Sequence, residues 1–74
     1  VAHPREIFRS ALLNNGARIL VYHNHPSGNT EPSEADLIFT KRMEEAGSIL
    51  GIDLLDHIIV SGKEWLSLRE YGLL

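Results

Sequence analysis

The chain alternates between stretches of helical and of strand periodicity, which divide it into five expected elements. Apolar residues recur every three or four positions in two stretches, and each stretch ends near a glycine suited to a helix C-cap, Gly16 and Gly51. Apolar and β-branched runs predict three strands, with a hairpin turn at 61–63 before the last of them. In chain order, the expected helix, strand, helix and two strands cover about Pro4–Asn15, Arg18–His25, Glu34–Leu50, Leu54–Val60 and Trp65–Leu68.

The long helix lies between two apolar runs, an order that is typical of a right-handed β-α-β crossover. We therefore expect an α/β or α+β fold, with a small mixed sheet, flanking helices and a largely buried first strand. The pattern leaves the strand directions open. Phe39, Met43, Ala46 and Leu50 step by four, three and four residues, so they form the face of the long helix that is expected to pack.

The amino-acid composition excludes several kinds of functional site. The 74 residues carry a net charge of -3 and include no cysteine, which excludes disulfides, thiolate zinc sites and thiol nucleophiles. Ten acidic residues against seven basic ones give no electrostatic footprint for nucleic acid. No apolar run approaches the roughly 20 residues that span a bilayer, and the N-terminus shows no signal sequence, so we expect a cytoplasmic protein without membrane contact.

Two histidines at the end of the first expected strand are the strongest candidates for chemistry. Because side chains alternate along a strand, His23 and His25 project from the same side and can converge on one ion. The chain then turns at Pro26 and returns in a helix whose first turn follows Ser33 and holds Asp36, so a carboxylate can approach the histidines. An H-x-H pair alone is weak evidence for a metal site, and this returning segment strengthens it.

Two histidines and one aspartate leave a fourth tetrahedral position for water, which is typical of catalytic zinc. Imidazole is a poor ligand for Mg²⁺ and Ca²⁺, so we expect Zn²⁺, with Fe²⁺, Co²⁺ and Ni²⁺ left open. The expected chemistry is hydrolysis of an amide or similar bond, because such ions activate water and polarise carbonyls. Ser33 and Asp36 also match a helix capping box, and Ser33 could instead, or also, donate a hydrogen bond to a developing oxyanion.

Other candidate residues have ordinary structural interpretations. His57 lies inside an apolar strand next to Asp56, where a hydrogen-bonded core or edge histidine is expected rather than a fourth ligand. Trp65 and Tyr71 are expected in the core and at the rim, since no basic groove surrounds them in the sequence.

Several segments together resemble a known family. The residues HNHPSG at 23–28, and the spacing H-x-H, seven residues, S, two residues, D, resemble the JAMM (MPN+) metallopeptidase motif. With LLDHIIV at 54–60 and SLREYG at 67–72, the similarity narrows to the RadC family of bacterial JAMM-like domains and covers nearly the whole chain. The resemblance implies a cytidine-deaminase-like JAMM fold. Residues 1–74 are then expected to form the C-terminal part of that one domain, without its N-terminal strands.

The resemblance also implies roles for individual residues. His23, His25 and Asp36 would be the zinc ligands, and Ser33 would help to stabilise the tetrahedral intermediate. Such enzymes use a glutamate as general base, which lies on a strand N-terminal to the segment present here. Glu6 is a poor substitute, because it falls on the first turn of the first helix, where it complements the helix dipole.

Two functions remain as hypotheses. The first is a zinc-dependent hydrolase of the JAMM type that cleaves a peptide or isopeptide bond in a peptide or protein substrate, with DNA repair attached only through the family label. The alternative is a non-catalytic RadC/MPN-like binding module that acts through protein or DNA partners. A zinc nucleoside deaminase is excluded, because that site needs a P-C-x-x-C pair and this chain has no cysteine.

Overall fold

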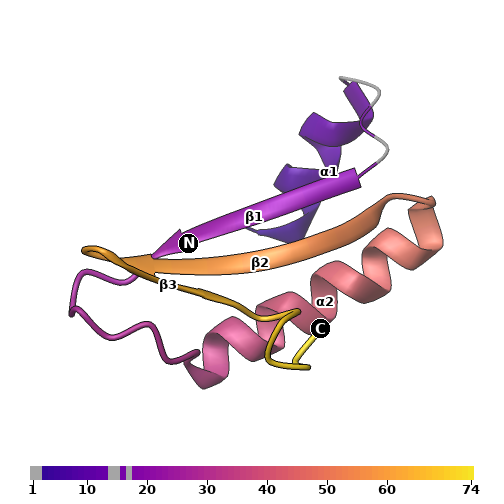
Figure 1. Cartoon of the computed structure of the whole chain (residues 1–74). Coiled ribbons are helices and arrows are strands. Elements are labelled where there is room, and N and C mark those ends of the chain that lie inside the picture. The colour runs from indigo at the N-terminus through magenta and orange to yellow at the C-terminus, as the bar shows by residue number, and fades with distance from the viewer. Residues whose placement is uncertain (1–2, 14–15, 17) are drawn as a thin grey trace.

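In the part of the chain that the structure describes, two helices and three strands follow one another in the order that the sequence predicts. The computed structural model describes residues 3–13, 16 and 18–74. The elements, shown in Figure 1, are α1 (Pro4–Leu13), β1 (Arg18–Asn24), α2 (Glu34–Leu50), β2 (Asp53–Ser61) and β3 (Glu64–Ser67). The last two residues of the predicted first helix, Asn14 and Asn15, lie outside the described residues.

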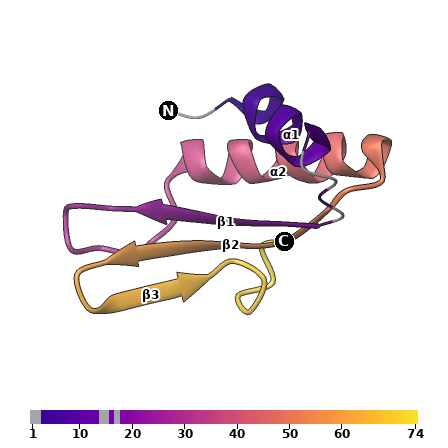
Figure 2. The same cartoon turned by 90° about the horizontal axis from the view of Figure 1, so that it is seen from above.

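The three strands form one mixed sheet in the order β1-β2-β3, and they lie side by side in Figure 2. β1 and β2 are parallel and are connected through α2, so the predicted β-α-β crossover is present. β2 and β3 are antiparallel and pair up to Ser61 and Glu64, on either side of Gly62, whose φ is 60°. The expected α/β class, a small mixed sheet with helices against it, is confirmed.

Capping interactions set both ends of helix α2. Ser33 caps its N-terminus in a capping box with Asp36, and Gly51 ends it in the left-handed conformation with φ 71°. Its buried face differs in part from the predicted one and consists of Asp36, Thr40, Met43 and Gly47. Met43 is buried as predicted, whereas Leu50 is exposed. Two polar residues and a glycine belong to this face, and a count of apolar residues cannot detect them.

The apolar core joins both helices to the sheet. One buried cluster consists of Phe8 of α1, Met43 of α2, Leu54 of β2 and Ile52, which lies between α2 and β2. A second cluster lies around Ile59 of β2 and contains Leu66 and Leu68. Because Ile52 follows directly after the Gly51 cap, the end of α2 places the next apolar residue in the core. No helix in the described part of the chain is long and apolar enough to cross a membrane.

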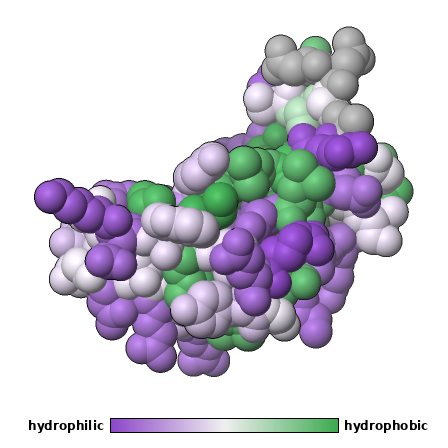
Figure 3. Space-filling view, in the orientation of Figure 1, coloured by the Kyte–Doolittle hydropathy of each residue, from purple (hydrophilic) through white to green (hydrophobic). Residues whose placement is uncertain are grey.

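β1 is not the largely buried strand that its apolar run predicts. Its burial alternates: Ile19 and Val21 are half-buried against the core, whereas Leu20 and Tyr22 are 44% and 64% exposed. β1 pairs only with β2 in the described sheet, and α1 and α2 contribute to the same core cluster, so alternate side chains of β1 face away from that core. Figure 3 shows apolar side chains on the surface over the middle of the molecule.

Trp65 also lies outside the core, with 59% of its surface exposed, which corrects the prediction of a core position. Trp65 pairs with Val60 of β2, and Tyr22 of β1 pairs with Ile58, which lies two residues before Val60 on the same strand. Since residues two apart on a strand share a face, Trp65 and Tyr22 lie on the same face of the sheet, opposite to the helices. Tyr71 is exposed, as predicted for a rim residue.

A carboxylate fastens β2 to the turn that follows β3. Oδ1 of Asp56 accepts hydrogen bonds from the backbone N–H groups of His57 at 2.8 Å and Arg69 at 3.0 Å, and the Ser67 hydroxyl donates to Oδ2. Burial acts to raise the pKa of Asp56, but the bonds from Ser67, Arg69 and His57 outweigh it and lower the pKa below its ordinary value. The ionised carboxylate is therefore the form that the fold stabilises.

Gly47→Ala is expected to destabilise the protein by roughly 1–3 kcal/mol, although alanine is the better helix former. A Cβ at this position would lie 2.2 Å from the carbonyl oxygen of Ile52, so backbone has to move. Urea unfolding followed by circular dichroism measures the change. Ser48→Ala, at the exposed neighbouring position of α2, is the matched control and should leave the free energy of unfolding within about 0.5 kcal/mol.

Asp56→Asn is expected to lower the free energy of unfolding by about 1.5–3 kcal/mol near neutral pH. The Ser67 hydroxyl accepts from the Glu70 N–H and donates toward Asp56, so an amide NH₂ there would face a donor. The folded pKa of Asp56 is depressed, so its contribution is present above the unfolded pKa and is lost as the pH falls through the folded pKa. The difference in the free energy of unfolding between the wild type and Asp56→Asn should therefore become smaller in acid.

The measurement is a series of urea unfolding curves from neutral pH into acid. Asp53→Asn, at an exposed position of the same strand, is the control and should leave the free energy of unfolding near neutral pH within about 0.5 kcal/mol. A constant gap between Asp56→Asn and wild type at all pH values would contradict the assignment.

Candidate metal centre

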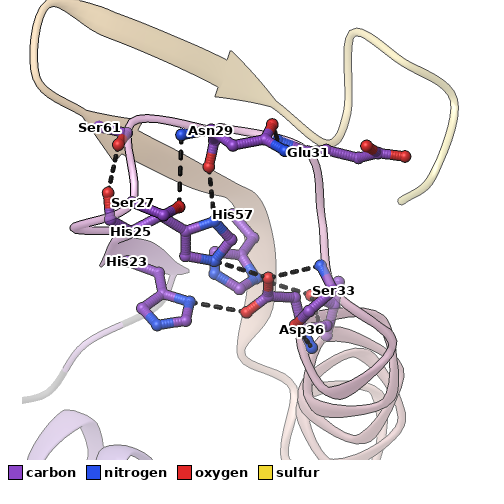
Figure 4. A network of polar contacts seen from close by, with 10 residues as sticks. His23, His25, Ser27, Asn29, Glu31, Ser33, Asp36, His57 and Ser61 are labelled. Atoms are coloured by element: carbon purple, nitrogen blue, oxygen red, sulfur yellow. Dashed lines mark hydrogen bonds and ion pairs between the residues drawn. The ribbon is translucent and has the colours of Figure 1, made fainter.

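Asp36 brings the residues of the H-x-H segment together. Its side chain is buried, with the residue 3% exposed, in the first turn of α2. Oδ1 lies 2.7 Å from Nδ1 of His23, and Oδ2 lies 2.9 Å from Nε2 of His25. Dashed lines mark both contacts in Figure 4. The structure thus places in direct contact the three residues that the sequence singles out as metal ligands.

Strand pairing fixes the two histidines at the end of β1. His23 pairs with Ile59 in the parallel register, and the N–H of His25 donates to the carbonyl oxygen of Val60 at 2.8 Å. The Ser61 hydroxyl donates to the carbonyl oxygen of His25. The backbone at both histidines is therefore held by β2, and their side chains leave the sheet on the side of α2.

The loop between β1 and α2 orients the second histidine. Nδ1 of His25 lies 3.0 Å from the carbonyl oxygen of Asn29, so it carries the proton in the neutral ring and donates it there. The side chain of Asn29 in turn accepts from the N–H of Glu31 at 2.9 Å. The loop thus leaves Nε2 of His25 with a lone pair that faces Asp36.

Ser33 and Asp36 form the predicted capping box. The N–H of Ser33 donates to Oδ2 of Asp36 at 2.8 Å, and the N–H of Asp36 donates to Oγ of Ser33 at 3.0 Å. Burial acts to raise the pKa of Asp36, but hydrogen bonds from Ser33 and His23 outweigh it and lower the pKa below its ordinary value. Asp36 is therefore an anion held in place, while the oxyanion role of Ser33 stays a prediction.

The donor set fits a metal ion. With Nδ1 protonated, Nε2 of His25 and Oδ2 of Asp36 are both acceptors, and an approach of 2.9 Å is favourable only with a proton or a metal cation beside them. Imidazole nitrogen and carboxylate oxygen are both zinc ligands. The cluster can therefore hold a metal.

His57 belongs to the same cluster. It is 1% exposed and its Nδ1 lies 2.7 Å from Oγ1 of Thr40, which confirms the predicted buried, hydrogen-bonded histidine. His23, Asp36 and His57 each offer one ligand atom, and these three atoms lie within 4.8 Å of one another. Such a group could hold a metal ion. Burial lowers the pKa of His57, so its ring is held neutral.

Sequence reasoning missed this position of His57. Its parallel partner is Val21, two residues before His23, so the two histidines emerge on the same face of adjacent strands. The sequence contains the alternation along β2 but not the register between β1 and β2, and only the register brings His57 to the site. Glu6, considered as a base, has an exposed side chain in the first turn of α1.

Comparison with known proteins identifies the family of the chain. A family profile for the RadC-like JAB domain matches residues 1–73. The chain belongs to the RadC-like JAB domain family. The predicted RadC resemblance is therefore confirmed.

Three relatives illustrate the similarity. The chain is 61% identical over 70 residues to a UPF0758 protein of Enterococcus faecalis, covering 95% of this chain and 30% of that protein. It is 54% identical over 72 residues to a UPF0758 protein of Listeria monocytogenes and 50% identical over 72 residues to one of Clostridium botulinum, each covering 97% of this chain and 32% of the relative. This RadC-like domain thus spans about a third of the length of the curated relatives it matches.

Ser33→Ala is expected to lower the free energy of unfolding by about 0.5–2 kcal/mol, because the N–H of Asp36 loses its side-chain acceptor. It should also raise the pKa of Asp36, since hydrogen bonds from Ser33 help to depress it. Urea unfolding and an NMR titration of the Asp36 carboxyl carbon measure the two effects. Ser33→Thr retains an oxygen acceptor and serves as the control, and equal behaviour of both variants would contradict the cap.

Proposed function

We propose that this RadC-like domain is a zinc-dependent hydrolase domain that cleaves a peptide or isopeptide bond. The observation that carries the proposal is the contact of one buried carboxylate, Asp36, with both histidines of the H-x-H segment at 2.7 and 2.9 Å. We assign His23, His25 and Asp36 as the metal ligands. When bound, zinc would supply Lewis acidity toward a substrate carbonyl and lower the pKa of a water molecule.

The protein groups around the ligands support this chemistry. The carbonyl oxygen of Asn29 holds the ring of His25 so that a ligand nitrogen faces Asp36, which is the usual arrangement around metal-binding histidines. Ser33 holds the carboxylate of Asp36 through its N–H, and its hydroxyl lies beside the same group. We propose that this hydroxyl also donates to the oxyanion of the attacked carbonyl.

The second candidate is a binding module that acts through a partner rather than by catalysis. It is favoured by the exposed aromatic side chains of Tyr22 and Trp65 on the sheet face opposite to the helices. Apolar surface of this kind often marks a contact with another protein. The binding site would then lie on the other side of the sheet from the metal ligands, so the two functions can be tested by separate variants.

Metal analysis of the purified full chain by inductively coupled plasma mass spectrometry is the first test. We expect about one zinc ion per chain, and its loss in the double variant with His23→Ala and His25→Ala. His3→Ala is the matched control, because His3 is exposed and its Nδ1 accepts from the Arg5 N–H outside the cluster. Absence of bound metal after incubation with zinc would contradict the proposal.

Cleavage of a peptide library by the zinc-loaded protein then separates the two functions. Asp36→Ala should abolish zinc-dependent cleavage, and Ser33→Ala should reduce kcat by about 10²–10³-fold. Zinc binding without cleavage, together with a partner that is released by Trp65→Ala, would favour the binding module.

A further inference from the structure

Among the described residues, Nε2 of His57 stands out as a buried side-chain nitrogen without a hydrogen-bond partner. Buried polar atoms are almost always paired, so an exception inside a functional cluster points to a ligand. His57 is not part of the set that the proposed function requires. Its ring lies 6.0 Å from that of His23, centroid to centroid, with the two planes 28° apart.

Thr40 determines which nitrogen of His57 carries the proton. The hydroxyl of Thr40 donates to the carbonyl oxygen of Asp36 at 2.8 Å, and it has a single proton to give. Its 2.7 Å contact with Nδ1 of His57 must therefore be one in which Nδ1–H donates and Oγ1 accepts. Nε2 of His57 then bears a lone pair, which is the form that binds metal ions.

The lone pair belongs to a residue that the fold has placed in the cluster. Ligand atoms of His57, His23 and Asp36 lie within 4.8 Å of one another. Figure 4 shows the rings of the three histidines gathered on one side of the Asp36 carboxylate. A metal-binding histidine typically donates its other N–H to an oxygen that fixes the ring, and Thr40 occupies that place here.

We propose that His57 is an additional ligand of the metal, bound through Nε2, and that Thr40 is the residue that positions it. The inference rests on the metal site proposed above and extends it to three imidazoles and one carboxylate. These four protein ligands fill four coordination positions of the metal. Binding of water or substrate to the metal then requires a coordination number of five or more, and catalytic zinc reaches five only in some states. The choice between zinc and the alternatives Fe²⁺, Co²⁺ and Ni²⁺ therefore depends on His57.

NMR of the wild-type full chain loaded with the NMR-active isotope of cadmium tests the ligand directly, because cadmium bound to an isotope-labelled imidazole nitrogen splits its signal. We expect splitting at Nε2 of His57 and at one nitrogen each of His23 and His25, with His3 as the internal control. Splitting at His23 and His25 but not at His57 would overturn the inference and leave the proposed metal site intact. Splitting at none of them would overturn both.

Variants of Thr40 test the positioning role. Thr40→Val keeps the shape but removes the acceptor, and it should weaken zinc affinity by about 10–100-fold and abolish the splitting at Nε2 of His57. Thr40→Ser keeps the hydroxyl and should restore both. Circular dichroism establishes that each variant is folded. Unchanged zinc affinity and splitting in Thr40→Val would overturn the role of Thr40, and if that variant does not fold, the wild-type splitting decides on His57.

Discussion

A buried carboxylate at the start of α2 is the constraint on which the site depends. A charge removed from water destabilises a fold unless donors or cations surround it. Asp36 meets this requirement with the N–H of Ser33 and with Nδ1 of His23 at the end of β1. Nε2 of His25, in the loop after β1, is an acceptor in the neutral ring and stabilises the carboxylate only with a proton or a metal cation beside the two groups. The helix cap, the loop and the strand end are therefore coupled, because each supplies part of the surroundings of one charged group.

Much of the fold and of the candidate site could be predicted because the deciding interactions are local. The capping box of Ser33 and Asp36 and the left-handed Gly51 set the limits of α2 within a few residues of sequence. The two-residue spacing of His23 and His25 puts both on one side of a strand in any fold that contains the strand. These features needed no knowledge of how the strands pair.

The wrong predictions concern relations between distant segments. The apolar run of β1 predicted a buried strand, but the exposure of Leu20 and Tyr22 depends on what lies on each side of the sheet. Trp65 is exposed for the same reason, since its face is set by pairing with β2. The parallel register between β1 and β2 brings His57 to the site, and this register shifts between Ile19 and Leu20. Side-chain periodicity within one strand does not contain this information.

The β-α-β topology itself places the site. In such a unit the two parallel strands end at the same edge of the sheet, and the connecting helix begins at that edge. The packed face of α2 changes character accordingly, from Asp36 and Thr40 near its start to Met43 and Gly47 farther along. The polar half meets the histidines of β1 and β2, whereas Met43 meets Phe8 and Leu54 in the core. One helix face thus serves the candidate metal centre at one end and the stability of the fold at the other.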